Sequence, residues 1–324
     1  MIKFKQIKRI KLNEIDTGDE TFSVNFMPNL GNLRYSIEKI GLIQPVILRK
    51  KLNRYQIICG FRRVSILRDL GSDEIEAIIC EEELNDKDFF IISIHDNLLG
   101  RGFNVVEKAI AIEKLVYRFK VDSTTVIHEF LPLLSLETSE KILNTYLSLA
   151  QMEEEVKIYV INEKVSHSNI RRLATFNQED RKALIPFISR LKLGENRLKE
   201  MLIFLSEISM RDRISIKEIL KKPEIETIIS QSELTSSQKT EKIKRILMNL
   251  RFPKLFQKEE EFEKRIKCLN LPSGISIQHS PYFEGREFKI SFQFETPDEY
   301  DSFINTLLIL KNNEEFKEMM RKFE

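Results

Sequence analysis

Hydrophobic and polar positions follow one another in short blocks over the first 105 residues, as they do in domains that mix strands and helices. Lysines and polar residues separate the apolar residues of positions 3–15, which predicts a partly exposed early strand. Three further strands are predicted over residues 45–48, 55–59 and 75–80. Helices are predicted over residues 33–40, 64–70 and 86–98. These short elements predict a small α+β domain that ends near residue 105.

Residues 106–235 have the three-to-four spacing of apolar positions that is typical of helices. Two helices, expected over residues 124–133 and 138–149, flank a break short enough for a helix-turn-helix, whose second helix enters the major groove of DNA. The candidate base-facing residues are Thr138, Ser139, Lys141, Asn144 and Thr145. An ordinary helical packing unit fits the same pattern. A single lysine beside Glu137 and Glu140 is a poor electrostatic match for DNA, since phosphate neutralisation supplies most non-specific affinity.

A polar stretch over residues 230–239 predicts a second domain boundary, and the most basic window of the chain follows it. Between Lys239 and Lys254 the only acid is Glu241. Phosphate neutralisation by basic side chains supplies most of the non-specific affinity for DNA. We therefore expect contact with the DNA backbone from Lys242, Lys244 and Arg245.

The last residues predict a strand over 275–279, a second strand over 288–294 and a helix over 298–310. The second strand alternates clearly, and its apolar face comprises Phe288, Ile290, Phe292 and Phe294. Two strands and one helix bury too little apolar surface for an independent core. A two-fold dimer that joins the hairpins of two copies would supply the missing partner sheet.

Composition narrows the class of protein further. The 324 residues include 52 basic and 50 acidic side chains, a net charge of +2, which argues against a histone-like coating of nucleic acid but permits a local basic face. The three cysteines lack a Cys-x-x-Cys spacing, so reduced thiols and no zinc site are expected. The start has no signal-peptide pattern and no run of 18 apolar residues occurs, which predicts a cytoplasmic protein without membrane association.

The stretch from Tyr55 to Arg63 carries the clearest candidate chemistry. A strand, a glycine and two arginines at a helix start are the parts of an anion site, because the first helix amides lack partners and Gly60 permits close approach. Arg62 and Arg63 could add charge-assisted hydrogen bonds. Asp96 and Asn97 are adjacent oxygen ligands of the kind that Mg²⁺ accepts beside phosphate. A surface turn and a solvated helix end would show the same residues.

Three separated stretches together resemble the ParB family of partition proteins. They are Gly41-Leu42-Ile43-Gln44-Pro45-Val46, Gly60-Phe61-Arg62-Arg63, and Asp96-Asn97-Leu98-Leu99 followed by Asn104-Val105-Val106-Glu107. Residues 152–174 resemble the family's run after its helix-turn-helix, and the final strand–strand–helix resembles its dimerisation domain. The resemblance implies a ParB/sulfiredoxin-like domain over residues 1–105, an all-helical middle domain over 106–235 and a small ββα dimerisation domain over 236–324.

Family membership implies a homodimeric clamp on double-stranded DNA that CTP with Mg²⁺ gates, located at the nucleoid and served by a partner ATPase. Carried onto this sequence, the nucleotide site comprises Gln44, Gly60, Phe61, Arg62, Arg63 and Asn97. Asp96 and Asn97 would hold Mg²⁺, with Asp96 in place of the family's glutamate.

Two departures bear on hydrolysis. Phe61 stands where the family has the glutamate thought to support hydrolysis, and Gly100 stands at its motif arginine, with Arg101 one place later. We therefore expect a diverged member that binds nucleotide and turns it over slowly, if at all. Two alternatives remain: a nucleotide-independent DNA-binding or adaptor dimer, and an enzyme of the ParB/sulfiredoxin fold such as a kinase or nuclease. Against the enzyme, the sequence offers no identifiable catalytic acid for a kinase and no cluster of carboxylates able to hold the two metals of a nuclease.

Overall fold

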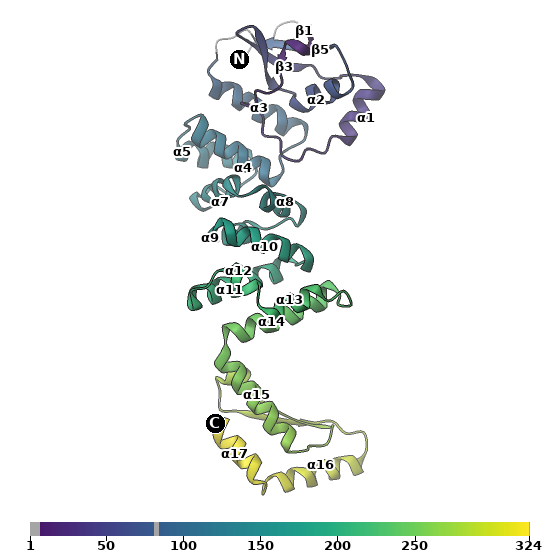
Figure 1. Ribbon diagram of the computed structural model, residues 1–324, viewed down its shortest axis with the longest axis vertical. Helices are drawn as coiled ribbons and strands as arrows, with labels where there is room; N and C mark the ends of the chain where they lie inside the picture. The colour runs from purple at the N-terminus through teal and green to yellow at the C-terminus, as the bar shows by residue number, and fades with distance from the viewer. Residues whose placement is uncertain (1–6, 81–83, 324) are drawn as a thin grey trace. The chain divides into compact units, whose positions relative to one another are not determined.

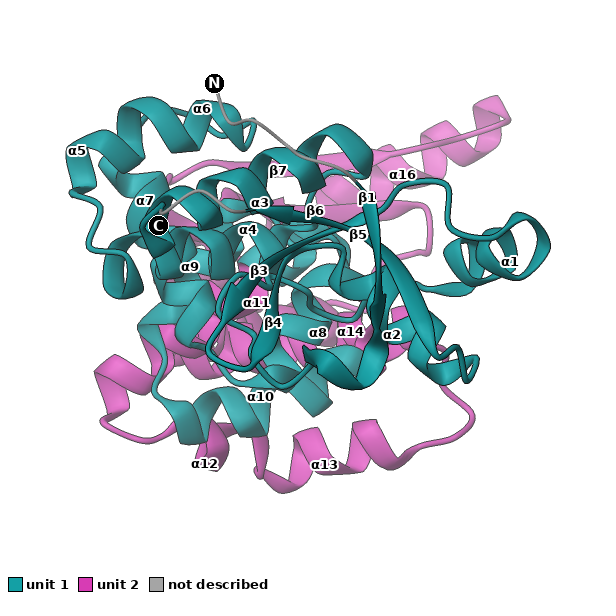
Figure 2. Cartoon of the chain, turned by 90° about the horizontal axis from the view of Figure 1, so that it is seen from above, with its two compact units in different colours: residues 1–189, 194–199 teal, residues 190–193, 200–324 magenta. Residues whose placement is uncertain are grey.

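The computed structural model describes residues 7–80 and 84–323. The chain is α+β with a helical majority, as expected, and its elements are traced in Figure 1. It divides into two compact units, coloured separately in Figure 2: residues 1–189 with 194–199, and residues 190–193 with 200–324. The domain boundaries expected near residues 105 and 235 lie within these units and stay a prediction. Among the described residues, no helix is long and apolar enough to cross a membrane.

A five-stranded mixed sheet with the order β1-β5-β3-β4-β2 forms the first part of unit 1. The strands are β1 (Ile7–Lys11), β2 (Ile15–Asp16), β3 (Val46–Lys51), β4 (Arg54–Cys59) and β5 (Glu74–Cys80). The prediction of one continuous strand over residues 3–15 is wrong for residues 7–15, and residues 3–6 lie outside the described residues. Ile10 pairs with Ile75 at one sheet edge and Ile15 pairs with Tyr55 at the other, so a 3₁₀ turn, Leu12–Glu14, interrupts the strand.

Three helices accompany this sheet: α1 (Gly31–Ile40), α2 (Phe61–Asp69) and α3 (Asp86–Gly100). Buried aliphatic side chains of β3 and β4, such as Val46, Leu48 and Ile57, form the core together with Val64 of α2. Helix α2 begins three residues earlier than the expected start at Val64, because the left-handed conformation of Gly60 ends the strand and turns the chain at once.

Helices make up the rest of unit 1. They are α4 (Val105–Glu113), α5 (Ser123–Thr125), α6 (Leu131–Leu133), α7 (Glu140–Gln151), α8 (Glu154–Asn162), α9 (His167–Thr175) and α10 (Gln178–Leu191). A π-helical segment, Lys114–Arg118, prolongs α4, and another, Val126–Phe130, joins α5 to α6 in place of the regular helix expected over residues 124–133. Helix α4 packs on α7 and α7 packs on α9, and Ile112, Tyr146 and Leu173 of these three helices are buried.

Unit 2 includes α11 (Glu195–Asp212) from Glu200 onward. It continues through α12 (Ile216–Leu220), α13 (Pro223–Ser230), α14 (Ser236–Arg251) and α15 (Pro253–Cys268). The antiparallel pair β6 (Ile275–His279) and β7 (Phe288–Phe292) follows, then α16 (Pro297–Leu310) and α17 (Glu314–Phe323). Phe262 of α15, Ile277 of β6 and Met319 with Phe323 of α17 form its terminal core. Helix α17 was not expected, although Phe316, Met319, Met320 and Phe323 have the spacing of one helix face.

Candidate functional site

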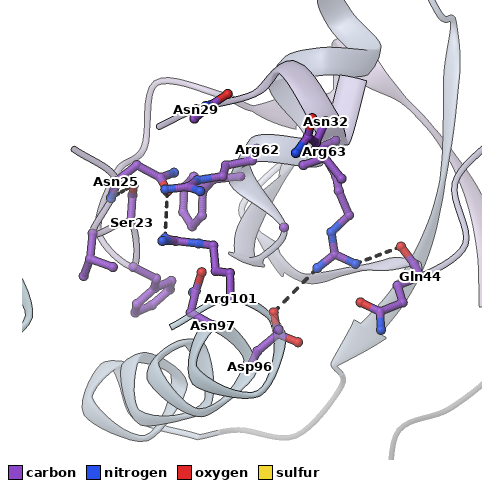
Figure 3. Close-up of a pocket in the computed structure, with 16 residues that line it drawn as sticks. Ser23, Asn25, Asn29, Asn32, Gln44, Arg62, Arg63, Asp96, Asn97 and Arg101 are labelled. Atoms are coloured by element: carbon purple, nitrogen blue, oxygen red, sulfur yellow. Dashed lines mark hydrogen bonds and ion pairs between the residues drawn. The ribbon is translucent and has the colours of Figure 1, made fainter. Parts of the chain in front are cut away.

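A cavity of about 340 Å³ lies in unit 1 where the β4–α2 turn, α3 and the loop after Phe22 meet. Figure 3 shows its lining side chains. All the residues selected from the sequence for nucleotide and metal binding line it: Gln44, Gly60, Phe61, Arg62, Arg63, Asp96 and Asn97. Residues more than fifty positions apart in the sequence are thus brought into one pocket, although their roles stay a proposal.

The turn at Gly60 brings the backbone into the pocket. Gly60 is the N-cap of α2 with φ +98°, and an added Cβ would lie 2.6 Å from Cγ1 of the buried Val46. Only glycine therefore fits both the backbone angle and the space. The first amides of α2 have no partner within the helix, and the positive end of the helix dipole lies here. This arrangement favours an anion at the mouth of the turn.

Arg63 links α2 to the loop before β3 and to α3. Its Nη1 donates to the carbonyl oxygens of Gln44 at 2.8 Å and Pro45 at 3.0 Å. Its Nη2 lies 3.5 Å from the carboxylate of Asp96. The carbonyl of Gln44 thus holds Arg63, a contact that the sequence does not reveal.

Arg62 and Arg101 share one buried carboxylate, that of Glu107. Arg62 donates to Oε1 of Glu107 at 2.7 Å and to Oδ1 of Asn25 at 2.9 Å, and Arg101 donates to Oε2 of Glu107 at 2.6 Å. Burial lowers the pKa of Arg62, with the charge of Arg101 acting in the same direction and Glu107 opposing it. Arg101 thus lines the pocket although it stands one place later than the family's arginine.

Glu107 closes the Asn104-Val105-Val106-Glu107 stretch, which by itself indicates no role for the Glu107 side chain in the pocket. Its side chain is 1% exposed, and it forms a capping box with Asn104 at the start of α4. The Asn104-x-x-Glu107 spacing is the signal that predicts the cap. No local pattern predicts that the same carboxylate holds two arginines of the pocket.

Asp96 and Asn97 lie in the last turns of α3. The side-chain Nδ2 of Asn97 donates to the carbonyl oxygen of Ser93. The Oδ1 atom of Asn97 therefore points away from this hydrogen bond. Within the described residues no group of three or more His, Cys, Asp or Glu side chains could hold a metal ion alone. One carboxylate with one amide oxygen fits Mg²⁺, which keeps waters and takes most of its ligands from bound phosphates. Asp96 would then exchange its contact with Arg63 for the ion.

The loop that forms another wall of the pocket is fastened to the end of α4. The ammonium of Lys114 donates to the carbonyl oxygens of Glu20, Thr21 and Ser23, at 2.5–3.2 Å. Burial, aided by the charge of Arg118, lowers the pKa of Lys114 to about 8. Ser23 and Asn25 of this loop line the pocket, so α4 helps to position a wall that the sequence did not connect with it.

The residues expected to face DNA lie in the first turns of α7 or just before it. Thr138, Lys141 and Asn144 are exposed, and the hydroxyl of Ser139 caps the helix by accepting from the amide of Ile142. Thr145 is 2% exposed and donates to the carbonyl of Lys141, because it lies on the face of α7 that packs inward. A side chain this buried cannot reach a base edge, so we exclude Thr145 from the candidate DNA-binding surface.

The basic window on α14 is partly neutralised by its own unit. Lys244 pairs with Glu200 at 2.9 Å, Arg251 pairs with Glu207, and Lys239 donates to a backbone carbonyl. Lys242 and Arg245 are exposed. These two retain the stronger claim to a DNA contact.

The residues expected to form the apolar face of the second hairpin strand differ in burial: two pack against other parts of the chain and two are exposed. Phe288 stacks on Phe262 of α15 with ring centroids 6.3 Å apart, and Phe292 packs against α16. Ile290 and Phe294 remain 41% and 51% exposed. Part of the cover expected from a second copy therefore comes from α15, α16 and α17 of the same chain, and the exposed part remains available for a partner.

The first part of the chain resembles a known protein family. The profile described as ParB N-terminal domain matches residues 1–98. Residues 1–98 are therefore similar to ParB N-terminal domains. The chain is 27% identical over 175 residues to a nucleoid occlusion protein of Halalkalibacterium halodurans, covering 52% of this chain and 59% of that protein. It is 29% identical over 165 residues to a probable chromosome-partitioning protein ParB of Campylobacter jejuni, covering 51% and 56%. The matches thus span little more than half the length of these relatives.

Solved ParB structures are also similar to the chain. One is a C-terminally truncated Caulobacter crescentus ParB complexed to the centromeric parS site, with 15% identity and a TM-score of 0.36 over 65% of this chain and 95% of that one. Another is the Caulobacter protein complexed with CTP-γ-S, with 19% identity and a TM-score of 0.27 over 56% and 98%. At these TM-scores the likeness supports no statement about function.

Proposed function

We propose that this ParB-domain chain is a dimeric, nucleoid-associated DNA-binding protein whose N-terminal pocket binds a nucleoside triphosphate with Mg²⁺, CTP being the nucleotide that the resemblance implies. The observation that carries the proposal is the pocket itself. A helix N-terminus, three guanidinium groups and the Asp96–Asn97 pair converge there, on the domain that matches the ParB family.

The charges of the pocket suit a polyphosphate. Arg62, Arg63 and Arg101 outnumber the two carboxylates that pair with them, and the helix dipole adds partial positive charge. Gly60 exposes backbone donors, and arginine forks match phosphate oxygens in geometry. The cavity volume of about 340 Å³ is in the range of small-molecule sites.

Within the part of the chain that the structure describes, the lining of this pocket offers no evident hydrolytic group. Phe61 lines it and also packs against the core of the sheet, so it offers no acid or base to orient water. Asp96 is the one carboxylate among the described residues that lines the pocket, and it contacts Arg63. We therefore propose binding with slow or absent turnover, so that the nucleotide acts as a gate for a clamp on double-stranded DNA.

Calorimetric titration with CTP, ATP, GTP and UTP in Mg²⁺ tests the nucleotide site. We expect selective CTP binding by the wild type. Arg62→Ala removes a charge-assisted hydrogen bond of about 1.5–3 kcal/mol, which should weaken binding by roughly 10- to 100-fold. Arg9→Ala, which removes the same charge from an exposed position of β1, should bind as the wild type does. If none of the four nucleotides binds, with or without DNA, the nucleotide-independent or adaptor alternative holds instead.

Electrophoretic shift of random duplex DNA at low and physiological salt tests the DNA surface. Lys242→Ala and Arg245→Ala should each weaken binding without changing sequence preference, and should lower the slope of log affinity against log salt by about 1. Lys244→Ala should have a smaller effect because Glu200 already pairs with Lys244. Absence of binding at both salt concentrations would favour a protein adaptor, and equal effects of all three variants would contradict the part assigned to Glu200.

A further inference from the structure

Glu107 is a buried carboxylate with a complete set of partners. Its Oε1 accepts from Arg62 at 2.7 Å and from the backbone amide of Phe26 at 3.4 Å. Its Oε2 accepts from Arg101 at 2.6 Å and from the backbone amide of Asn104 at 3.1 Å. A carboxylate can accept about four such bonds, so all its capacity is used in this arrangement.

Two of these four donors are also the pocket's own cations. Arg62 and Arg101 both line the cavity, and each guanidinium carries five donors, of which Glu107 uses one. Their two positive charges exceed the single charge of Glu107, so an anion is still attracted. A triphosphate brings more charge and more acceptors than the carboxylate, and it competes for the same donors.

The other two donors connect Glu107 to the elements around the pocket. Asn104 is the N-cap of α4, and Glu107 completes its capping box. Phe26 belongs to the loop that Lys114, at the far end of α4, holds through the carbonyls of Glu20, Thr21 and Ser23. A change at the Glu107 carboxylate therefore reaches both the start of α4 and the loop wall.

We propose that Glu107 is an internal counter-ion of the pocket: a bound phosphate group displaces it from Arg62 and Arg101 and thereby loosens the start of α4 and its hold on Phe26. Glu107 is then a positioning residue that couples occupancy of the pocket to the first helix of the helical region. This inference rests on the proposed function, since it needs a phosphate ligand in the pocket.

Glu107→Gln separates this role from a structural one, because glutamine keeps the capping box but removes the charge. The uncompensated Arg62 and Arg101 should then bind an anion more tightly. We expect inorganic pyrophosphate and CTP with Mg²⁺ to bind about tenfold more tightly than to the wild type, a typical size for coupling between sites. Glu113→Gln, the same change further along α4, is the control and should leave both affinities unchanged.

Hydrogen exchange on the wild type supplies a readout that needs no variant. Ligand should accelerate exchange of the Asn104 amide, since its acceptor leaves, and Glu107→Gln should reduce this response. Tighter binding by Glu107→Gln supports the proposal, even if the wild type itself fails to bind. Equal or weaker binding by a folded Glu107→Gln, with wild-type binding intact, overturns it while the proposed function stands. If neither protein binds either probe, both proposals fail. If the variant does not fold, hydrogen exchange on the wild type decides: unchanged or slower exchange of the Asn104 amide on ligand binding overturns the role of Glu107 but not the proposed function.

Discussion

Gly60→Ala is expected to destabilise unit 1 by roughly 2–5 kcal/mol and to remove ligand binding from the pocket. Two effects combine. Alanine is strained at φ +98°, and its Cβ would lie 2.6 Å from Val46 Cγ1, a fully buried atom of a stiff β-branched side chain. Relief requires a shift of either β3 or the β4–α2 turn, and the second shift moves the amides that face the pocket. Denaturant unfolding and pyrophosphate titration measure the two consequences.

Gly71→Ala is the matched control at the other end of α2. Gly71 also has a positive φ, +73°, but nothing lies within 4 Å of an added Cβ. This variant should cost only the backbone term, about 1–2 kcal/mol, and should retain ligand binding. Equal destabilisation by the two substitutions would show that contact with Val46 does not restrict the turn.

Phe262→Ala is expected to cost about 3–5 kcal/mol and to unfold the terminal part of unit 2. Phe262 is 5% exposed, and its ring contacts four aromatic side chains. They are His279, Phe283, Phe288 and Phe323, with centroid separations of 4.8–6.3 Å. Truncation leaves a cavity between α15, the hairpin and α17. Hydrogen exchange over residues 253–323 should locate the loss, and sedimentation should show a monomer if this part holds the proposed dimer.

Phe294→Ala removes the same atoms from a position that is 51% exposed. Its effect on unfolding should stay within about 0.5 kcal/mol, as is usual at the surface, whereas dimerisation should weaken if Phe294 lies in the interface. A dimer that survives both substitutions would place the interface elsewhere. A stable fold in Phe262→Ala would mean that the aromatic cluster contributes little to the core.

Local sequence was informative wherever one short segment carried both an element and its chemistry. Gly60, Arg62 and Arg63 predict a turn and an anion site. The flexible backbone of the glycine, the charges of the two arginines and the start of a helix lie within four residues. In the final hairpin β6 occurs at the residues expected for the first strand, whereas β7 ends at Phe292, two residues before the expected end of the second strand. The resemblance to ParB, carried by three such segments, is confirmed for residues 1–98.

Local sequence failed where a residue acts through distant partners. The burial of Thr145 depends on the face that α7 turns inward, and the pairing of Lys244 depends on Glu200 of another helix. The interrupted first strand depends on β1 and β2 pairing at opposite sheet edges. Helix α17 is different, because the spacing of its apolar residues is a local signal that the sequence itself contains.

The sequence by itself determined the α+β class, the order of most elements and the residues that turn the chain at the pocket, because backbone preference and apolar periodicity are local properties. Only the tertiary structure decided that Arg101 lines this pocket, that the buried Glu107 pairs with Arg62 and Arg101, and that Lys114 fastens the loop wall. A buried charged side chain needs hydrogen-bonding partners, and the fold can supply them from any part of the chain. Such pairs therefore have no fixed spacing in the sequence.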